Sequence, residues 1–368
     1  MSIRRLRINL PSAPYEVRVG AGATQGLGAI VAELHDPGRA VVIADSEVAS
    51  LYAPAVTESL EKAGFTVTNL TVPHGEQNKN LEVAGELYSA LAQSGLGRDG
   101  LVCALGGGVV GDMAGFVAAT YLRGVSFVQL PTTLLAMVDA SVGGKNAVDI
   151  AEGKNLVGTF YQPLHVMADT AFLASLPPRE WACGFGEVVK SAVIGPPVFY
   201  DWLCNNVEAL VAHDQATVED AIAQCVAFKA DVVISDEHET LGRRECLNYG
   251  HTFGHALEKV AGFGVYSHGQ AVAEGMRFAA RLGAEISDTS IDFVEEQDAL
   301  LDAMGLPAIE QAYSADALCE AMYGDKKVRS GILRFVIPLE QGRWELVNVP
   351  RDAVMNHLRA WQASRGNQ

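Results

Sequence analysis

The chain has 368 residues, of which 49% are hydrophobic and 19% charged, and its formal net charge at pH 7 is −17. This composition is typical of a well-packed globular protein, and the length favours two domains. The acidic surplus argues against broad binding to nucleic acids or anionic membranes, because a phosphate backbone needs a basic face.

The first half of the chain alternates short, β-rich apolar runs with helical patterns. The predicted strands cover residues 39–47, 65–73, 101–108 and 125–131, and the predicted helices between them cover residues 56–64 and 81–95. Buried strands separated by helices predict a parallel sheet with crossover connections.

In the second half the strand signal nearly vanishes after the sequence SLPPRE. Helices are predicted at residues 180–195, 218–236, 246–260 and 270–285, followed by one hairpin candidate at residues 331–349. The proline pair Pro177–Pro178 favours a domain boundary at this point. We therefore predict an α/β domain at residues 1–176 and a mostly helical domain at residues 177–368.

The six cysteines are scattered without a C-x-x-C pair, which is typical of buried thiols in a reducing cytosol. The N-terminal segment has no apolar run long enough for a signal peptide, and no stretch approaches the ~20 apolar residues of a membrane span. We expect a soluble, cytoplasmic protein.

A glycine-rich turn follows the third predicted strand. Gly106, Gly108 and Gly111 match G-x-G-x-x-G, in which glycines let the backbone approach a pyrophosphate at a helix N-terminus. The motif alone is weak, and the acid that normally follows ~20 residues later is absent. Asp45 and Glu76 end two other predicted strands, however, and nucleotides bind at the carboxyl ends of parallel strands. A dinucleotide site in a non-standard version of the fold therefore stays open.

Two histidines lie four residues apart in the segment LNYGHTFGHALEK. This step places His251 and His255 on the same side of a helix. His268 precedes the next predicted helix, and Glu187 lies on an otherwise apolar one. A carboxylate with two or three imidazoles favours zinc or a similar divalent ion with an open position for substrate. The spacing does not select which three of these residues bind.

Isolated cations recur in glycine-rich or apolar contexts. They are Lys145, Lys154, Lys190, Lys229, Arg243, Arg244, Lys326 and Lys327. In so acidic a chain, this set favours an anionic substrate over a solvated face. A nucleotide domain, a metal and an anion clamp together predict an alcohol oxidation, in which the metal polarises a hydroxyl and a nicotinamide accepts the hydride.

Over nearly its whole length the chain resembles the 3-dehydroquinate synthase family, sugar-phosphate cyclases of the shikimate pathway. The resemblance rests on the motifs PHGEQNK, LGGGVVGD, YLRGVSFVQLPTTLLAMVDASVGGK, GKNLVGTFYQP, LPPRE, GEVVK, LNYGHTFGHA and HGQAVAEGM, in this order. It implies a Rossmann-like N-terminal α/β domain and a mostly helical C-terminal domain. It also implies NAD, one divalent metal ion (zinc, with cobalt as an alternative) and a homodimer.

The resemblance assigns a role to each matched residue. The metal ligands would be Glu187, His251 and His268, with His255 handling protons beside the ion. NAD would contact Asp45, Glu76, Lys79, Gly107, Gly108, Val109, Asp112, Thr132, Thr133, Asp139, Lys145 and Lys154. The substrate phosphate would be bound by Lys145, Asn155, Lys326 or Lys327, and Arg123 reaching across the dimer. Lys229 and Arg244 would hold the substrate carboxylate, Lys190 and Asn248 its hydroxyls, and Glu239 would add a further polar group.

The implied reaction converts 3-deoxy-D-arabino-heptulosonate 7-phosphate to 3-dehydroquinate and phosphate. Metal-assisted oxidation acidifies the neighbouring hydrogen, phosphate leaves by elimination, and NADH returns its hydride. The ring then opens and closes again on carbon, with no net redox change.

Two departures from the family pattern bear on the substrate. Asn146 stands where the family usually has threonine, and the loop ETLGRREC is one residue longer. The family's substrate-binding arginine therefore aligns with Arg243 when residues are counted forward from Lys229, and with Arg244 when they are counted back from Asn248. We favour Arg244 because the segment after the loop matches the family without gaps. Either departure could mark another sugar-phosphate cyclase.

Two further alternatives are less favoured. A metal-dependent glycerol or alcohol dehydrogenase of the same fold would not need so many anion-binding cations. A non-catalytic relative would not need to keep the metal ligands and Lys145.

Overall fold

The computed structural model describes residues 3–324 and 332–365, and the chain divides into two compact units. The first unit comprises Met1–Leu176 and Lys229–His238, and the second comprises Pro177–Phe228 and Glu239–Gln368. Lys326 and Lys327, predicted to bind the substrate phosphate, lie outside the described residues. Among the helices that are described, none is both long and apolar enough to cross a membrane.

The first unit ends after Leu176 and also takes in residues 229–238, which the sequence analysis places in the C-terminal domain. Two side-chain contacts of this segment lie within the first unit. Lys229 Nζ lies 2.6 Å from Asp139 Oδ1, and the rings of His238 and Phe160 meet edge to face.

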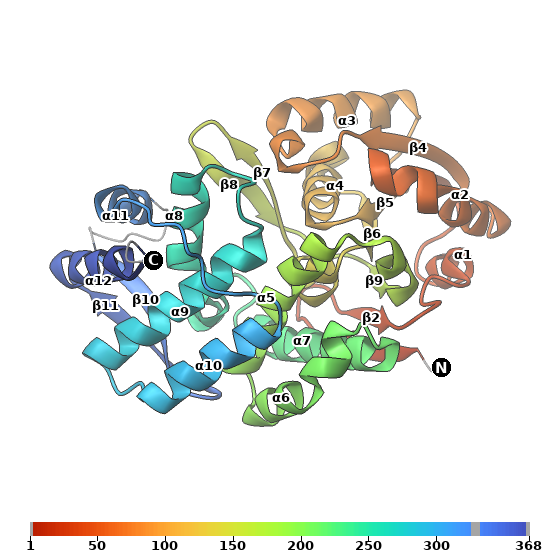
Figure 1. Cartoon of the computed structure of the whole chain (residues 1–368). Coiled ribbons are helices and arrows are strands. Elements are labelled where there is room, and N and C mark those ends of the chain that lie inside the picture. Colours follow the sequence, from red (N-terminus) through yellow and green to blue (C-terminus); the bar gives the residue numbers. More distant parts are fainter. Residues whose placement is uncertain (1–2, 325–331, 366–368) are drawn as a thin grey trace. The chain divides into compact units, whose positions relative to one another are not determined.

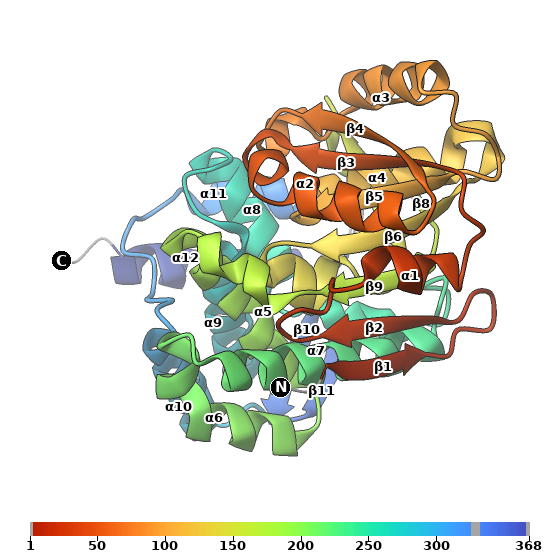
Figure 2. The ribbon, with the colours of Figure 1, turned by 90° about the vertical axis from the view of Figure 1, so that its right-hand side faces the viewer.

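A seven-stranded sheet with the order β1-β2-β9-β6-β5-β3-β4 forms the centre of the first unit (Figures 1 and 2). The strands are β1 (Arg4–Ile8), β2 (Tyr15–Val19), β3 (Arg39–Asp45), β4 (Thr66–Val72), β5 (Leu101–Gly106), β6 (Ser126–Pro131) and β9 (His165–Ala168). Neighbouring strands pair in parallel, except that β1 is antiparallel to β2. The predicted parallel sheet is confirmed. Strands β1, β2 and β9 were not predicted, because the first two carry arginines in place of an apolar run and the third is short.

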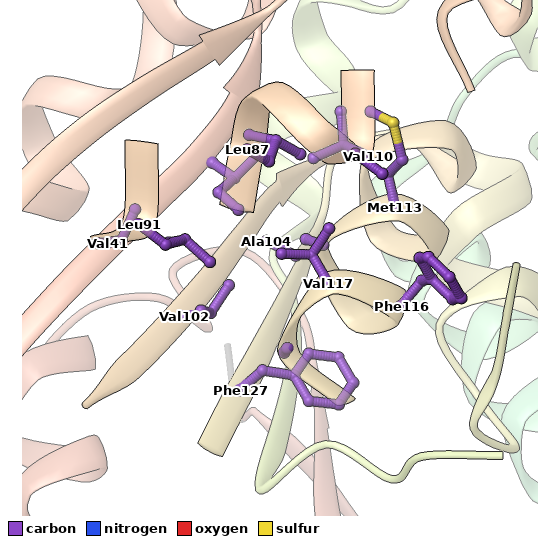
Figure 3. Packing of buried hydrophobic residues seen from close by; sticks show 14 of the residues in the cluster. Val41, Leu87, Leu91, Val102, Ala104, Val110, Met113, Phe116, Val117 and Phe127 are labelled. Carbon is purple, nitrogen blue, oxygen red and sulfur yellow. The ribbon is translucent and has the colours of Figure 1, made fainter. Parts of the chain in front are cut away.

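Helices cover both faces of this sheet. They are α1 (Leu27–Ala32) and α2 (Ser46–Lys62) on one face, and α3 (Leu81–Gln93) and α4 (Gly108–Thr120) on the other. Strand β5 is therefore buried along its whole length, as strands covered on both faces are. Figure 3 shows Val102 and Phe127 of the sheet packing with Leu87 of α3 and Val117 of α4 in one core.

The sheet has a topological switch point between β3 and β5. Strand β3 pairs with β4 on one side and with β5 on the other, so the chain proceeds in opposite directions from these two neighbouring strands. Crevices of this kind, at the carboxyl ends of the strands, are where open α/β sheets bind ligands. Asp45 and Gly106 end the two strands at this crevice.

An antiparallel hairpin also belongs to the first unit. Its strands are β7 (Lys145–Ile150) and β8 (Gly153–Phe160), and it follows a π-helical turn at Ala136–Ala140. The hairpin was not predicted, because its strands are rich in glycine and polar residues and lack a long apolar run.

The second unit is mostly helical, as predicted. It contains α5 (Pro178–Ile194), α6 (Pro197–Val211), the first part of α7 (Gln215–Ser235), α8 (His251–Ala261), α9 (His268–Ile286), α10 (Ile291–Ala303), α11 (Ala315–Tyr323) and α12 (Arg351–Arg365). The predicted hairpin is confirmed as β10 (Leu333–Glu340) and β11 (Arg343–Val349). Its apolar residues pack with those of α8, α9, α11 and α12 in a second core.

The helix predicted at residues 246–260 is confirmed only from His251 onward. A 3₁₀ turn (Arg243–Asn248) precedes Gly250, whose φ of 78° is left-handed, and α8 starts only at His251. Gly250 also touches α9, since a Cβ at Gly275 would lie 1.8 Å from the Gly250 carbonyl oxygen. The break in the helix therefore lets α8 begin against the backbone of α9.

Candidate nucleotide, anion and metal sites

The glycine turn of the first unit leaves a helix N-terminus open to an anion. Strand β5 ends at Gly106, and α4 starts at Gly108 with Gly107 as an N-cap that offers no side-chain hydrogen bond. A Cβ at Gly107 would lie 3.1 Å from the Thr133 methyl group, so the backbone approaches this threonine closely. The Thr132 hydroxyl is buried and has no hydrogen-bond partner within the described part of the chain. These features fit a pyrophosphate, which uses backbone N–H groups and the helix dipole.

A buried lysine stands next to this turn. Lys79 Nζ lies 2.5 Å from Asp112 Oδ2 on α4 and donates to Asn155 Oδ1 at 2.6 Å. Burial opposes the charged form, but Asp112 and Glu76 outweigh it and raise the pKa of Lys79. Lys154 Nζ lies 3.8 Å from Glu76 Oε1. The structure thus brings together four residues predicted to contact NAD and one, Asn155, predicted to bind phosphate.

Two aspartates predicted to contact NAD have further partners in the first unit. Asp45 caps helix α2, because its Oδ1 accepts from the N–H groups of Glu47 and Val48 at 2.8 and 3.0 Å. Asp139 accepts from Lys229 Nζ through both its carboxylate and its carbonyl oxygen. Lys229, predicted to hold a substrate carboxylate, is therefore paired with a carboxylate of the protein.

The predicted phosphate-binding residues of the first unit are exposed. Lys145 follows two glycines with left-handed backbone, and Asn155 on β8 is itself left-handed with φ 54°. Asp149 holds this strained residue, because its Oδ1 accepts from the Asn155 N–H at 2.7 Å. Sequence reasoning missed Asp149, although an acid between two lysines that are themselves site candidates, Lys145 and Lys154, is a usable signal. Arg123 lies on an exposed turn with φ 68°, where it points away from the core.

The residues of the second unit that were predicted to bind a metal ion come together from three helices. Glu187 of α5 is fully buried, and its Oε1 lies 3.6 Å from His251 Nε2 and 3.5 Å from His268 Nε2. Two ligands on one tetrahedral zinc ion, with bonds of 2.0–2.2 Å, lie roughly 3.4 Å apart. His255 is a neighbour of the same cluster, since ligand atoms of the three histidines lie within 4.8 Å of one another. The donor set fits a divalent ion.

Glycines next to the ligands allow this convergence. A Cβ at Gly186 would lie 2.6 Å from the Gly269 carbonyl oxygen, and a Cβ at Gly269 would lie 2.1 Å from the Cys183 carbonyl oxygen. Helices α5 and α9 therefore touch backbone to backbone beside Glu187 and His268. Larger residues would force the two helices, and with them the two ligands, apart.

Charges within this cluster are strongly coupled. Burial disfavours ionised Glu187, but its ion pair with Lys190 and its contact with His268 prevail and lower the pKa to about 2. For His268, burial is likewise outweighed by Glu187 and Glu258, and its pKa rises to about 10. Glu258 Oε2 lies 3.3 Å from His268 Nδ1, which orients the other ring nitrogen toward Glu187. Glu258 was not predicted as a site residue, although it stands three residues after His255.

The remaining predicted residues of the second unit lie near the start of α8. Arg244 is 1% exposed, whereas Arg243 is at the surface. Asn248 ends the 3₁₀ turn, and Glu239 has a left-handed backbone with φ 56°. His251 Nδ1 faces the Tyr249 carbonyl oxygen at 3.0 Å. It must donate there, so Nε2 is the nitrogen through which His251 would bind a metal ion.

Two solved sugar-phosphate cyclase structures are similar to the whole chain. A 2-deoxy-scyllo-inosose synthase, complexed with carbaglucose-6-phosphate, NAD⁺ and Co²⁺, is 26% identical with a TM-score of 0.85, over 97% of this chain and 99% of that one. ValA, the 2-epi-5-epi-valiolone synthase of Streptomyces hygroscopicus subsp. jinggangensis 5008, has NAD⁺ and Zn²⁺ bound. It is 25% identical with a TM-score of 0.86, over 95% and 97% of the two chains.

Sequence comparisons narrow this likeness to one family. The 3-dehydroquinate synthase of Desulforamulus reducens is 43% identical over 349 residues, which cover 95% of this chain and 97% of that protein. The enzyme of the same name from Pelobacter propionicus is 43% identical over 350 residues, with the same coverage. The family models for the N-terminal and C-terminal parts of 3-dehydroquinate synthase match residues 69–183 and 184–328. The chain belongs to the 3-dehydroquinate synthase family.

Proposed function

We propose that the chain converts 3-deoxy-D-arabino-heptulosonate 7-phosphate to 3-dehydroquinate and phosphate. The observation that carries the proposal is the cluster of Glu187, His251 and His268, with Nε2–Oε1 distances of 3.6 and 3.5 Å, in a chain of this family. When bound, a divalent ion supplies a Lewis acid for a substrate hydroxyl, and NAD supplies reversible oxidation at that carbon.

In the second unit, neighbouring residues set the orientation and the protonation state of the proposed metal ligands. Lys190, 1% exposed, pairs with Glu187 and offers further N–H groups to a substrate hydroxyl. Glu258 and the Tyr249 carbonyl oxygen each accept from a histidine Nδ1, so that Nε2 of His268 and of His251 stays available. His255, whose ring meets that of His251 edge to face, is placed to take up or release a proton beside the ion.

In the first unit, the proposed task is to bind the nucleotide and the substrate phosphate. Lys79, Asp112 and the N-terminus of α4 hold the nucleotide. Lys145 and Asn155 hold the phosphate. The protein must retain this group while its bond to the substrate carbon breaks. The cations proposed for this site must position the phosphate dianion without cancelling its charge completely, so that the phosphate can still act as a base. We further propose that Arg123 reaches a second copy in a homodimer, and that the enzyme acts in the cytoplasm with zinc as its ion.

The test is phosphate release from the heptulosonate phosphate, with NADH absorbance followed in the same cuvette. Stoichiometric phosphate without lasting NADH is the expected result. NADH that rises with turnover while no phosphate appears would instead indicate a dehydrogenase. If the protein binds NAD and metal but gives neither signal, the proposed substrate is wrong, and hexose phosphates are the next substrates to test.

A further inference from the structure

The turn before β7 is followed by one exposed and one buried residue. Gly143 and Gly144 have φ values of 99° and 68°, which glycine adopts at little cost. Lys145 comes next with an exposed side chain, and Asn146 after it is only 1% exposed. Neighbours in a strand point to opposite faces, so Asn146 lies directly beneath the turn that presents Lys145.

Asn146 uses its side-chain amide on two main-chain carbonyls. Its Nδ2 lies 2.9 Å from the Gly144 carbonyl oxygen and 2.9 Å from that of Tyr161. The Gly144 carbonyl oxygen also accepts from the Tyr161 N–H at 2.8 Å. The carbonyl immediately before Lys145 is therefore held by two hydrogen bonds, and Asn146 connects it to the end of the hairpin.

Tyr161 is a firm anchor for this connection. Its ring stacks on Phe127 with the centroids 5.6 Å apart, and its hydroxyl donates to the Val125 carbonyl oxygen at 2.9 Å. Phe127 belongs to the buried core between the sheet and α4. The turn is thus connected through Asn146 and Tyr161 to the buried core of the first unit.

The asparagine side chain has no room to turn away. A Cβ at Gly115 would lie 1.9 Å from Asn146 Oδ1, so α4 passes this residue only because position 115 is glycine. Oδ1 is buried and has no hydrogen-bond partner among the residues described, which costs free energy. An apolar residue would avoid that cost in free energy. Asparagine offsets it with the two hydrogen bonds that its Nδ2 donates.

We propose that Asn146 is a positioning residue that holds the turn Gly143–Lys145 in the shape that binds the substrate phosphate. The inference rests on the proposed function, because it takes Lys145 to bind that phosphate. The threonine usual in the family has one hydroxyl hydrogen and can hold only one carbonyl. In this chain the turn is therefore more preorganised, and preorganisation favours affinity for the bound group.

The experiment compares Asn146→Ala and Asn146→Thr with the wild-type holoenzyme. The readouts are kcat and KM for the heptulosonate phosphate, the inhibition constant of inorganic phosphate, and the dissociation constant of NAD. Without both donors, we expect Asn146→Ala to raise KM and the phosphate inhibition constant about tenfold. We expect kcat to change less than KM and NAD affinity to stay as in the wild type. Asn146→Thr, with one donor, should recover part of the loss.

A matched control removes a hydrogen bond elsewhere in the same unit. Tyr88→Phe deletes the hydroxyl that contacts Thr120 Oγ1 at 2.6 Å, and it should leave KM and the phosphate inhibition constant unchanged. Wild-type values in Asn146→Ala would overturn the proposal. So would a parallel loss of phosphate and NAD affinity, since that indicates general loss of structure. If Asn146→Ala does not fold, wild-type phosphate inhibition in Asn146→Thr would overturn it, and an intermediate value would support it.

Failure of the proposed function is distinguishable from failure of this inference. If the wild type releases no phosphate from the heptulosonate phosphate, the function is wrong. Calorimetric titration of the NAD-bound protein with inorganic phosphate then still compares the three proteins. Weaker binding by Asn146→Ala supports the positioning role, whereas equal binding, or no binding by the wild type, overturns it.

Discussion

The two units build their candidate sites from different materials. In the first unit, the glycine turn Gly106–Gly108 and the left-handed turn Gly143–Gly144 shape the candidate nucleotide and anion sites, and lysines such as Lys79 and Lys145 add charge to them. In the second unit the metal site consists of side chains, and glycines such as Gly186 only bring the helices close enough for them to meet. Phosphate groups suit backbone N–H groups, whereas a divalent ion needs carboxylate and imidazole ligands.

A buried histidine of the first unit and a half-buried histidine of the second show the same contrast in electrostatics. Burial, aided by Arg18, lowers the pKa of His165 in the first unit to about 4. In the second unit Glu187 and Glu258 outweigh burial and raise the pKa of His268 to about 10. Burial with a nearby arginine therefore favours the neutral form of one imidazole, whereas two carboxylates outweigh burial and favour the charged form of the other. A cluster of buried charges of this kind is typical of a functional site.

The largest expected effect comes from breaking the side-chain site. Glu187→Gln keeps the shape but removes the charge that holds both a metal ion and Lys190. We expect no retained metal and a fall in turnover of roughly 1,000-fold, because Lewis-acid catalysis contributes several kcal/mol. Metal content by atomic emission and the phosphate-release rate measure this, with the exposed Glu86→Gln as control. Full turnover with one metal ion per chain would remove Glu187 from the site.

A change in the proposed phosphate site of the first unit should leave metal binding unchanged. Lys145→Ala deletes one charge-assisted hydrogen bond to the substrate phosphate, so we expect kcat/KM to fall about 100-fold. Metal content and NAD affinity should stay unchanged, and inhibition by inorganic phosphate should weaken. Lys62→Ala, which removes an exposed lysine paired with Glu58, is the matched control. An unchanged kcat/KM would take Lys145 out of the phosphate site.

The side chains of the metal site and the glycine turn at Gly106 and Gly108 could be predicted from the sequence, whereas the close approaches of backbone could not. Glu187 and His251 stand out because a polar group in an apolar helix needs a reason. Gly186 looks like any other helical glycine until the helix that crosses it is known. Asp149 and Asn146 gain their meaning from a hairpin whose polar, glycine-rich strands gave no apolar pattern. The chemistry of a side chain can be predicted from the sequence itself. A close approach of two backbone segments cannot, because it depends on which elements meet in the fold.

A third prediction tests whether glycines truly set the metal geometry. Gly186→Ala places a methyl group against the Gly269 backbone, so we expect a loss of about 2 kcal/mol in the free energy of unfolding and weaker metal binding. Gly85→Ala on α3 is the control, since a Cβ there meets no atom within 4 Å. That change should stabilise the protein by about 0.5 kcal/mol. Urea denaturation and metal titration check both variants. Equal stability of the two would show that the helix crossing can relax.

Glu258 tests the support around the ligands. Glu258→Gln keeps a hydrogen-bond acceptor for His268 Nδ1 but removes the charge, so we expect metal affinity to fall about tenfold with the fold intact. Competition with a chelator measures the affinity. Glu285→Gln, which changes the partner of His357 in the same unit, should leave metal affinity unchanged. Wild-type metal affinity in Glu258→Gln would show that the charge of Glu258 does not contribute to metal binding.

The smallest effect concerns the neutral histidine of the first unit. His165, 3% exposed, has its pKa lowered from 6.5 to about 4, so between these values the unfolded chain binds more protons at this site than the folded one. Its contribution to stability is therefore complete above pH 6.5 and is lost as the pH falls toward 4. The free energy of unfolding should fall by about 1 kcal/mol per pH unit in this window. In His165→Gln, which cannot titrate, the same urea denaturation series should show a shallower slope. Parallel slopes in the two proteins would mean that the buried imidazole takes up its proton without unfolding, and the contrast with His268 would then be one of degree only.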